Sequence, residues 1–529
     1  MLTKPRKTAL FSRKPLKVAG DVKNIAKVAF ATVGSRVLGL VRDSATMAYL
    51  GMGAVSAAYT FAFTLPNLFR RLLGEGALTS ALIPVFSQSL KADGREKAFE
   101  FLNKVLTRGA ILTVFLAALG MAVAFGASLF LENSEERFLL GADFSIVLMP
   151  YLALICLAAA FTAALNVLGS FGMPSITPAI HNGSIICGLF AGAFFFGARD
   201  AISIAYCMCF AWLVGGIFQL CIPAYWLYRK GWRFSFDLRP CPALGELYAL
   251  FLPALFGAAV YQLNVFVSKM LALLIDNSAL PSLYLSSRII ELPLGVFTLA
   301  VATVYFPKLS NLRYAETKAE YSREYANGFA ATLCIAVPAA FGIIATAPDI
   351  ISLLFQWGLF KAADSGVCAP VLIVSAFGLP FFAAATFATR GFHSHKDTRT
   401  PVRVSYWAFA ANFVLSLALM KPFGAVGLAA ANVAAAALTA VMLERKIGAL
   451  RGEFSEWGEI AKIVASSALM AGFVVLIRCA LASALEGKAL SIAVCAGAIP
   501  AGAAFYFAVL KLMRFKRLDS VGQLLRRKR

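Results

Sequence analysis

Residues 111–131 read ILTVFLAALGMAVAFGASLFL and carry no charged side chain. An α-helix rises about 1.5 Å per residue, so roughly 20 apolar residues cross the hydrocarbon core of a bilayer, which is about 30 Å thick. Similar runs recur along the whole chain, separated by short segments that contain charged residues, glycine or proline. The chain is therefore expected to form an all-α polytopic membrane protein.

The overall composition points the same way. Of the 529 residues, 60% are hydrophobic and 14% are charged, whereas soluble globular domains have about 45–50% apolar and about 25% charged residues. Too few polar side chains remain to cover the several soluble domains that this length would otherwise predict. An ordinary soluble fold is therefore excluded.

We expect about fourteen transmembrane helices, with bounds that are approximate by several residues. Their ranges are 25–50, 55–88, 104–131, 143–169, 176–197, 202–228, 242–275, 279–307, 325–355, 367–390, 400–420, 424–446, 458–484 and 488–514. The second, seventh and eighth ranges are long enough to contain tilted or broken helices, which transporters tolerate where the backbone lines a cavity.

The distribution of charge predicts the orientation of the chain and argues against nucleic acid as a partner. The formal net charge is +22, and its basic residues gather in both tails and after the second, sixth, eighth, tenth and twelfth ranges. The other connections carry far fewer, and one is acidic, with Glu132, Glu135 and Glu136. Short cytoplasmic loops collect lysine and arginine, so both termini are expected to be cytoplasmic. Basic loops of this kind suit anionic lipid, whereas nucleic-acid binding would need a basic stripe interleaved with stacking aromatics.

Two segments with similar proline patterns indicate an internal repeat. Leu65-Pro66 is followed by Pro84, and Leu292-Pro293 by Pro307, in ranges that lie six spans apart. Two six-helix lobes with a pair of extra helices would explain this offset, although prolines also cluster at span ends without any repeat. The predicted organisation is a basic cytoplasmic tail at 1–24, an N-lobe at 25–228, a C-lobe at 242–446, a final helix pair at 458–514 and a basic tail at 515–529.

Neither a metal site nor an enzyme active site is predicted. The ten cysteines form no CxxC pair, and Cys207 and Cys209 are too close together for the usual zinc spacing. The chain contains no P-loop, nucleophile elbow or HExxH motif, so no catalytic residue and no cofactor are expected. Without a P-loop, the drive for transport would have to come from an unidentified coupling cation, the membrane potential or the flux of substrate.

Ionised side chains gather in the first, second and eighth predicted spans. Each costs roughly 2.5–3.5 kcal/mol at the bilayer centre, so such residues are expected to face protein or water. They are Arg36, Arg42 and Asp43 in the first span, Arg70, Arg71 and Glu75 in the second, and Arg288 and Glu291 in the eighth. The spacing places Arg36 and Asp43 on one helix face, directs Arg42 elsewhere and lets Arg71 and Glu75 pair. Each arginine group therefore has an acid nearby.

These arginines are candidates for binding a diphosphate, because a guanidinium donates two parallel hydrogen bonds and stays charged. The alternative is that they form structural ion pairs or extend to the membrane interface. We predict a cationic cavity made by Arg36, Arg42, Arg70, Arg71 and Arg288, with Asp43, Glu75 and Glu291 as charge partners or gating residues. Hinges or helix breaks are expected at Gly39, Pro66, Gly74, Gly76 and Pro293.

The motifs that contain these residues resemble one known family. The segment 34–43 (GSRVLGLVRD), the segment 65–71 (LPNLFRR) with 75–77 (EGA) and 83–84 (IP), and the segment 288–296 (RIIELPLGV) are similar to the first-, second- and eighth-helix motifs of the MurJ (MviN-type) lipid II flippases. Segments 355–358 (FQWG), 391–394 (GFHS) and 400–402 (TPV) continue the match, which covers nearly the whole chain in order.

The resemblance implies the fold of the MOP exporter superfamily, with two six-helix lobes in a V around a cationic cavity and an apolar lipid-tail groove on the last two helices. It implies flipping of lipid II, an undecaprenyl-diphosphate-linked disaccharide-pentapeptide, from the inner to the outer leaflet of the bacterial cytoplasmic membrane by alternating access. The family's essential arginines correspond to Arg36, Arg42, Arg70 and Arg288, and Asp43 matches an acidic partner. Membrane lipids and cell-wall synthesis proteins are the implied partners.

One departure from the family pattern concerns gating. Many members carry an acid early in the second helix, whereas this chain has Ser56-Ala57-Ala58-Tyr59 there. Two transport functions remain as alternatives: export of another polyprenyl-diphosphate-linked oligosaccharide, and multidrug or cation antiport within the same superfamily. An antiporter of cations would prefer an acidic cavity, and an intramembrane enzyme would need a convergent catalytic set that the sequence lacks. A membrane scaffold would leave the buried charges unexplained.

Overall fold

The computed structural model describes residues 18–170, 172–197, 200–295, 299–312, 318–451 and 457–515. Over these ranges the secondary structure is helical, without strands. The all-α prediction is therefore confirmed. The predicted tail at 1–24 lies outside the described residues up to position 17, but α1 already begins at Val18. Of the predicted tail at 515–529, only the first residue is described.

The first half of the chain forms eight α-helices and one π-helix. They are α1 (Val18–Leu50), α2 (Ala54–Phe69), η1 (Arg70–Leu78), α3 (Thr79–Ala92), α4 (Gly94–Phe130), α5 (Glu136–Leu148), α6 (Tyr151–Val167), α7 (Gly172–Phe196) and α8 (Ala201–Arg229). An extended segment, residues 230–241, leads into the second half.

The described part of the second half is helical in the same way. Its elements are α9 (Pro242–Ile275), α10 (Ala279–Pro293), α11 (Leu299–Leu312), α12 (Lys318–Phe355), α13 (Ala362–Phe377), α14 (Leu379–Ser394), α15 (Arg399–Arg451), α16 (Trp457–Ala482), α17 (Gly487–Ala493), η3 (Val494–Ala498) and α18 (Ile499–Leu512).

Each predicted span corresponds to one helix, to consecutive helices or to part of α15. Among the described residues, nine helices are long and apolar enough to cross a membrane, or ten if α5 and α6, bent by 43°, form one span. Two features lower this number. α15 covers two predicted spans joined at Gly424, and the helices that carry the buried charges (α1, α2 with η1, and α10) are not among the nine. The count of fourteen stays a prediction.

The positions expected to be hinges or helix breaks lie in different structural settings. Gly74 and Gly76 lie within η1, whose wider π-helical turn interrupts the α-helix there. Pro66 and Gly39 lie inside continuous helices, and Pro293 is the last residue of α10. The local interruption in the second span is therefore a π-helical segment, a feature that often accompanies functional sites.

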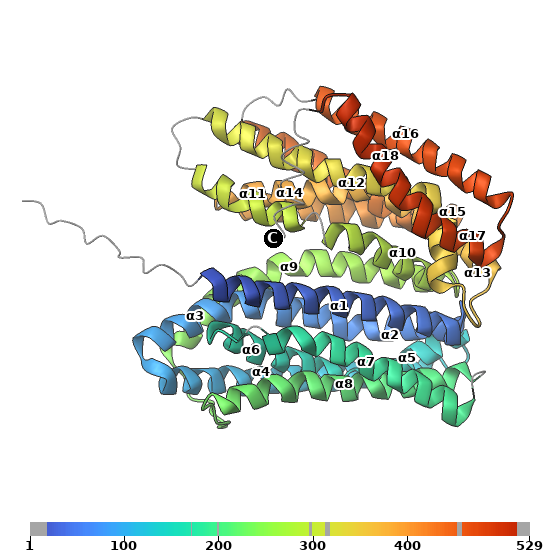
Figure 1. The fold of residues 1–529 in the computed structure, drawn as a ribbon. Helices are drawn as coiled ribbons and strands as arrows, with labels where there is room; N and C mark the ends of the chain where they lie inside the picture. Colours follow the sequence, from blue (N-terminus) through green and yellow to red (C-terminus); the bar gives the residue numbers. More distant parts are fainter. Residues whose placement is uncertain are drawn as a thin grey trace, which may run out of the picture.

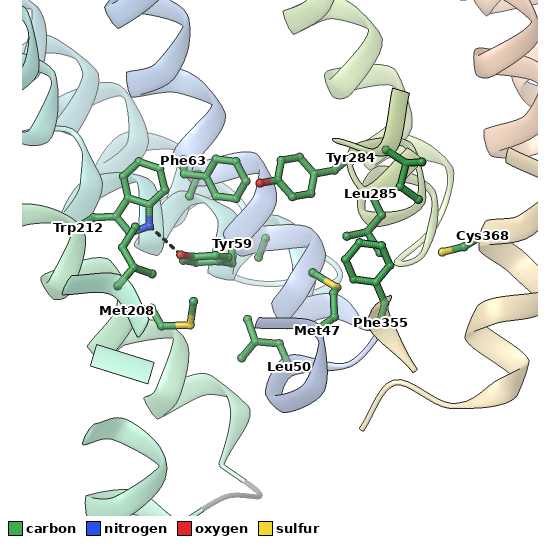
Figure 2. Close-up of a cluster of buried hydrophobic side chains, with 14 of the residues drawn as sticks. Met47, Leu50, Tyr59, Phe63, Met208, Trp212, Tyr284, Leu285, Phe355 and Cys368 are labelled. Atoms are coloured by element: carbon green, nitrogen blue, oxygen red, sulfur yellow. Dashed lines mark hydrogen bonds between the residues drawn. The ribbon is translucent and has the colours of Figure 1, made fainter. Parts of the chain in front are cut away.

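The helices of the two halves lie in two groups (Figure 1), with α1 and α2 facing α9 and α10 across the middle of the molecule. At one end the groups share a buried core that contains Met47 and Leu50 from the first half and Leu285, Phe355 and Cys368 from the second (Figure 2). The final helices pack on α12, where Tyr506 donates a hydrogen bond to the carbonyl of Cys334 (2.9 Å).

The contact between the halves at this end also uses the main chain. The amide of Leu359 donates to the carbonyl of Ala48 (2.7 Å), and the hydroxyl of Ser44 donates to the carbonyl of Leu354. Gly358 lies between these bonds with φ of 57°, and a Cβ there would lie 2.2 Å from the Ala48 carbonyl oxygen. The loop after α12 therefore closes onto the end of α1 only because residue 358 has no side chain.

Candidate functional site

A cavity of about 810 Å³ lies between the two halves. Its lining comes from α1, α2, η1, α3, α6, α7, α8, α10 and α14. All five predicted arginines line it, together with the acids Asp43 and Glu291. Arg36 and Arg288, which are 252 positions apart in the sequence, are thus brought to one space.

Asp43 lies at the centre of the charges, and its side chain is 5% exposed. Its Oδ1 accepts hydrogen bonds from Nε (3.0 Å) and Nη2 (2.5 Å) of Arg42. Its Oδ2 lies 3.3 Å from Nε of Arg288, which belongs to the other half. One buried carboxylate therefore compensates two arginines, and one of these ion pairs joins the halves.

Tyr284 connects the same groups. Its hydroxyl donates to Oδ1 of Asp43 (2.9 Å) and accepts from Nη2 of Arg42 (3.1 Å) and from Nη2 of Arg288 (3.0 Å). All three bonds are charge-assisted, which makes them shorter and stronger than bonds between neutral groups. The tyrosine therefore fixes both guanidinium groups relative to the carboxylate.

A second acid, Glu291, lies about one helical turn after Arg288 on α10. Glu291 accepts a hydrogen bond from Nη1 of Arg288 (3.2 Å), and its other oxygen lies 3.9 Å from Nη2 of Arg71 on η1. Its side chain is half exposed, so water weakens both interactions. The Arg288–Glu291 pair occurs as the spacing predicts, and Arg71 reaches an acid of the opposite half. The predicted pairing with Glu75 concerns a side chain outside those described.

Arg36 differs from the other arginines. It makes no hydrogen bond or ion pair with any residue that the structure describes, and its guanidinium lies against Gly295. A Cβ on Gly295 would lie 2.0 Å from Nη1 of Arg36. Although Arg36 and Asp43 are seven residues apart, Asp43 contacts Arg42 and Arg288 instead.

The remaining cavity wall is formed by neutral polar and aromatic side chains. Asn182 on α7 accepts from Nη1 of Arg42 (3.0 Å) and donates to the carbonyl of Ser35 (3.2 Å), and Arg70 donates from Nε to Asn67 (3.1 Å). Asn182 thus joins α7 to α1, and Arg42 points to this neighbouring helix as the sequence predicts.

Aromatic side chains from both halves pack next to Tyr284, and Figure 2 shows Trp212, Tyr59 and Phe63 beside it. The ring of Phe63 stacks on Trp212 (centroids 5.5 Å apart) and meets Tyr284 edge-on (5.2 Å). The indole of Trp212 donates to the hydroxyl of Tyr59 (2.7 Å). Because Phe63 and Trp212 belong to the first half and Tyr284 to the second, these ring contacts also join the halves.

The family model for the lipid II flippase MurJ matches residues 46–494 of the chain. The chain belongs to the lipid II flippase MurJ family. A probable lipid II flippase MurJ of Rhizobium meliloti is 32% identical over 513 residues, which cover 92% of this chain and 93% of the relative. A probable lipid II flippase MurJ of Vibrio cholerae is 29% identical over 515 residues, covering 93% and 96%. The resemblance of the sequence motifs is therefore confirmed.

Two solved structures show the same fold. A lipid II flippase MurJ in an inward closed conformation superposes with a TM-score of 0.77 at 23% identity, covering 92% of this chain and 98% of that one. An inward-facing multidrug resistance MATE family transporter of the MOP superfamily gives 0.63 at 16% identity, covering 78% and 95%. These likenesses show that the chain shares the fold of both structures.

At the position where many MurJ relatives are expected to carry an acid, Ala57 is fully buried. It packs among apolar residues that include Leu273, Leu280 and Leu428. A carboxylate in this setting would be desolvated without a partner among these neighbours.

Several residues of the site were not predicted from the sequence. Asn182, Tyr284 and Lys269 are polar residues inside apolar runs, and Lys269 is the only charged residue between Glu246 and Asp276. Its ammonium donates to Oγ1 of Thr64 on α2 (3.1 Å) and lies 5.7 Å from the Tyr284 ring centre. The sequence signal for this lysine is its position as a lone charge inside a long apolar run. A metal site is not indicated, since no group of three or more His, Cys, Asp or Glu residues occurs within the described ranges.

Proposed function

We propose that this protein flips lipid II from the inner to the outer leaflet of the bacterial inner membrane by alternating access. The observation that carries the proposal is the convergence of five arginines on one cavity between the halves. Together with membership of the MurJ family, it favours a diphosphate-linked substrate over the cationic substrates of multidrug antiporters.

The acids of the cavity act as internal counter-ions when no substrate is bound. A diphosphate offers more acceptor oxygens than Asp43, and each contact with a guanidinium is charge-assisted. When the diphosphate binds Arg42 and Arg288, it replaces Asp43 as their acceptor. The ion pair between Asp43 and Arg288 joins the halves, so its loss weakens the closed end.

The remaining arginines guide the substrate to this point. Arg36 is exposed to the cavity without a partner among the described residues. Arg71 makes only a long contact, 3.9 Å from its Nη2 to a carboxylate oxygen of Glu291. These groups receive the phosphates first, since little has to be broken. The head group then moves toward the buried pair, Arg42 and Arg288, where more donors converge.

Orientation follows from charge. The basic connections, including the segment between α8 and α9, lie at the end where α3 ends and α4 begins, and we place this end in the cytoplasm. The shared core at Leu50 and Phe355 then closes the outer end. The prenyl chain stays in lipid along α16 to α18, and the flipped product passes to the enzymes of cell-wall synthesis.

The test is complementation of a conditional lipid II flippase strain at matched membrane expression. Wild type should rescue growth, whereas Arg36→Ala and Arg288→Ala should fail. Arg445→Ala, which changes an exposed arginine outside the cavity, is the matched control and should rescue. Undiminished rescue by both cavity variants would refute the arginine mechanism.

Failure of the wild type needs a second measurement, because a foreign host can prevent function. Purified protein should then be tested for binding to lipid II and to a polyprenyl diphosphate that carries another oligosaccharide. Binding to lipid II alone supports the proposal. Binding to the other oligosaccharide alone would replace lipid II with that substrate class and leave the cavity mechanism in place.

A further inference from the structure

An apolar slot of about 230 Å³ lies behind the arginine cavity, between α4 and α9. Its walls are side chains of η1, α4, α6 and α9, among them Leu73, Leu112, Leu157 and Phe251. Arg108 is the one charged residue among those that line it. The slot faces away from the charges: η1 directs Arg70 and Arg71 into the cavity, and Leu73 and Leu78 into the slot.

The segment between the halves lies against α4 beside the slot. Arg108 donates from Nη2 to the carbonyls of Leu238 (2.5 Å) and Arg239 (3.3 Å). Lys104 binds the carboxylate of Asp237 (2.6 Å), and Trp232 donates to Asn103 (2.8 Å). These bonds hold the segment firmly on α4.

Held in this way, the segment presents apolar side chains to its surroundings. Phe234 is 63% exposed, Phe236 is 65% exposed and Leu238 is 49% exposed. A loop that displays two phenylalanines and a leucine in a fixed conformation exposes apolar surface that needs a cover.

Positive charge surrounds this apolar edge. Arg229, at the end of α8, and Arg233 and Arg239 in the connection are exposed, and Lys230 is half-buried. Asp237 is the only acid between positions 229 and 241. A basic rim around an apolar edge, placed where helices end at the membrane boundary, complements an anionic lipid.

We propose that the slot and its rim form a binding site for an anionic phospholipid. One acyl chain occupies the slot, the phosphate lies near Arg239 and Arg233, and Phe234 and Phe236 insert beside the head group. The acyl chain supports the apolar side of η1, so the lipid stabilises the turn that carries Arg70 and Arg71. The site is distinct from the cavity and does not depend on the transported substrate.

The test measures the melting temperature (Tm) of the purified full-length protein in detergent, with added phosphatidylglycerol or phosphatidylcholine. A ligand that binds only the folded state raises Tm. Wild type should show a rise of a few degrees with phosphatidylglycerol and a smaller rise with phosphatidylcholine. Equal rises with the two lipids would overturn the proposed charge recognition.

Gly109 in α4 offers a matched pair of variants. A Cβ at this position would meet only Leu157, at 3.8 Å, so Gly109→Ala fits and should keep the phosphatidylglycerol shift. Gly109→Leu should fill the slot and abolish the shift. Retention of the full shift in Gly109→Leu would refute occupation of the slot.

A surface variant covers the case in which Gly109→Leu fails to fold. Phe234→Ser with Phe236→Ser alters only exposed side chains and should reduce the phosphatidylglycerol shift, as should Arg239→Gln. Native mass spectrometry should find fewer bound phosphatidylglycerol molecules on these variants than on wild type. If the number of bound phosphatidylglycerol molecules and the Tm shift were unchanged in both variants, the proposed role of the aromatic and basic rim would be refuted.

Discussion

Asp43 is a single carboxylate that serves two arginines of different halves. Its neighbours Arg42 and Tyr284 are buried, and Arg288 lies 3.3 Å away from its second oxygen. Removing one partner from a buried ionic group leaves the others without compensation and costs about 3–5 kcal/mol. The stability of the closed conformation therefore depends strongly on this one side chain.

We expect Asp43→Asn to lower the melting temperature of the purified protein markedly in detergent. A polyprenyl diphosphate should restore much of the loss, because its phosphates supply the missing negative charge. Glu291→Gln is the control, since Glu291 is half exposed and its pairs should contribute at most about 1 kcal/mol. Equal effects of the two substitutions would contradict the central place of Asp43.

For single residues, the sequence identifies the charged side chains of the cavity well, but it does not identify the neutral side chains that bind them. Arginine inside an apolar run is costly, so Arg36, Arg42, Arg70, Arg71 and Arg288 are conspicuous, and all five line the cavity. Tyrosine and asparagine are less costly in such runs, so nothing in the sequence singles out Tyr284 or Asn182. Their roles follow only from the packing of α10 and α7 against α1.

Among the elements, the extended segment between α8 and α9 depends on one carboxylate. Asp237 accepts a hydrogen bond from Lys104 (2.6 Å), and the amide of Arg239 donates to its other oxygen (2.8 Å). These hydrogen bonds, first of all the one from Lys104, lower the pKa of Asp237. A carboxylate with a lowered pKa stabilises the folded segment above its ordinary pKa of about 3.9, and this stabilisation disappears as the pH falls through the lower value.

Hydrogen exchange of residues 231–241 should therefore depend on pH in a defined way. At neutral pH, Asp237→Asn should exchange faster than wild type, because the ion pair with Lys104 is lost. Well below pH 3.9, roughly the ordinary pKa of aspartate, the two proteins should converge, since wild type is protonated there as well. A difference that persists unchanged into acid would show that the ion pair does not hold the segment.

The sequence predicts the elements themselves well, because hydrophobic runs report directly on helices. The range 242–275 coincides with α9, and the other ranges overlap described helices, although α4 already begins at Gly94 and α15 contains two of the ranges. The π-helix η1 and the 43° bend between α5 and α6 were not predicted. The bend lies at Pro150, directly before α6, and η1 contains two glycines. Hydrophobic periodicity alone does not report such local breaks.

For the whole molecule, the decisive contact is the closure of one end by the loop after α12. Gly358 has φ of 57°, a conformation that costs other residues roughly 1–2 kcal/mol, and a Cβ would lie 2.2 Å from the carbonyl oxygen of Ala48. We expect Gly358→Ala to hold this end open. Gly366→Ala in nearby α13 is the control, because its Cβ would meet nothing within 4 Å.

Cys368 reports the opening. It is fully buried at this end, with its sulfur 3.9 Å from that of Met52. A membrane-impermeant maleimide should label Cys368 in Gly358→Ala, as read by peptide mass spectrometry, and spare it in wild type and Gly366→Ala. If Cys368 stayed unlabelled in Gly358→Ala, the result would contradict the role of the loop in closing this end. The sequence shows a glycine here, but which end of a transporter is closed depends on contacts between halves that only the structure reveals.

The closed end combines two kinds of contact that respond differently to salt. The bonds from Leu359 to Ala48 and from Ser44 to Leu354 involve main-chain carbonyls and no ions. The layer above them, centred on Asp43 and Arg288, consists of charges beside a water-accessible cavity. Mobile ions screen charges with a Debye length of about 8 Å at physiological strength and about 3 Å at 1 M, yet leave neutral hydrogen bonds unaffected. Rising ionic strength therefore weakens the exposed contact between Arg71 and Glu291 first, whereas the buried pairs of Asp43 and the backbone hydrogen bonds persist.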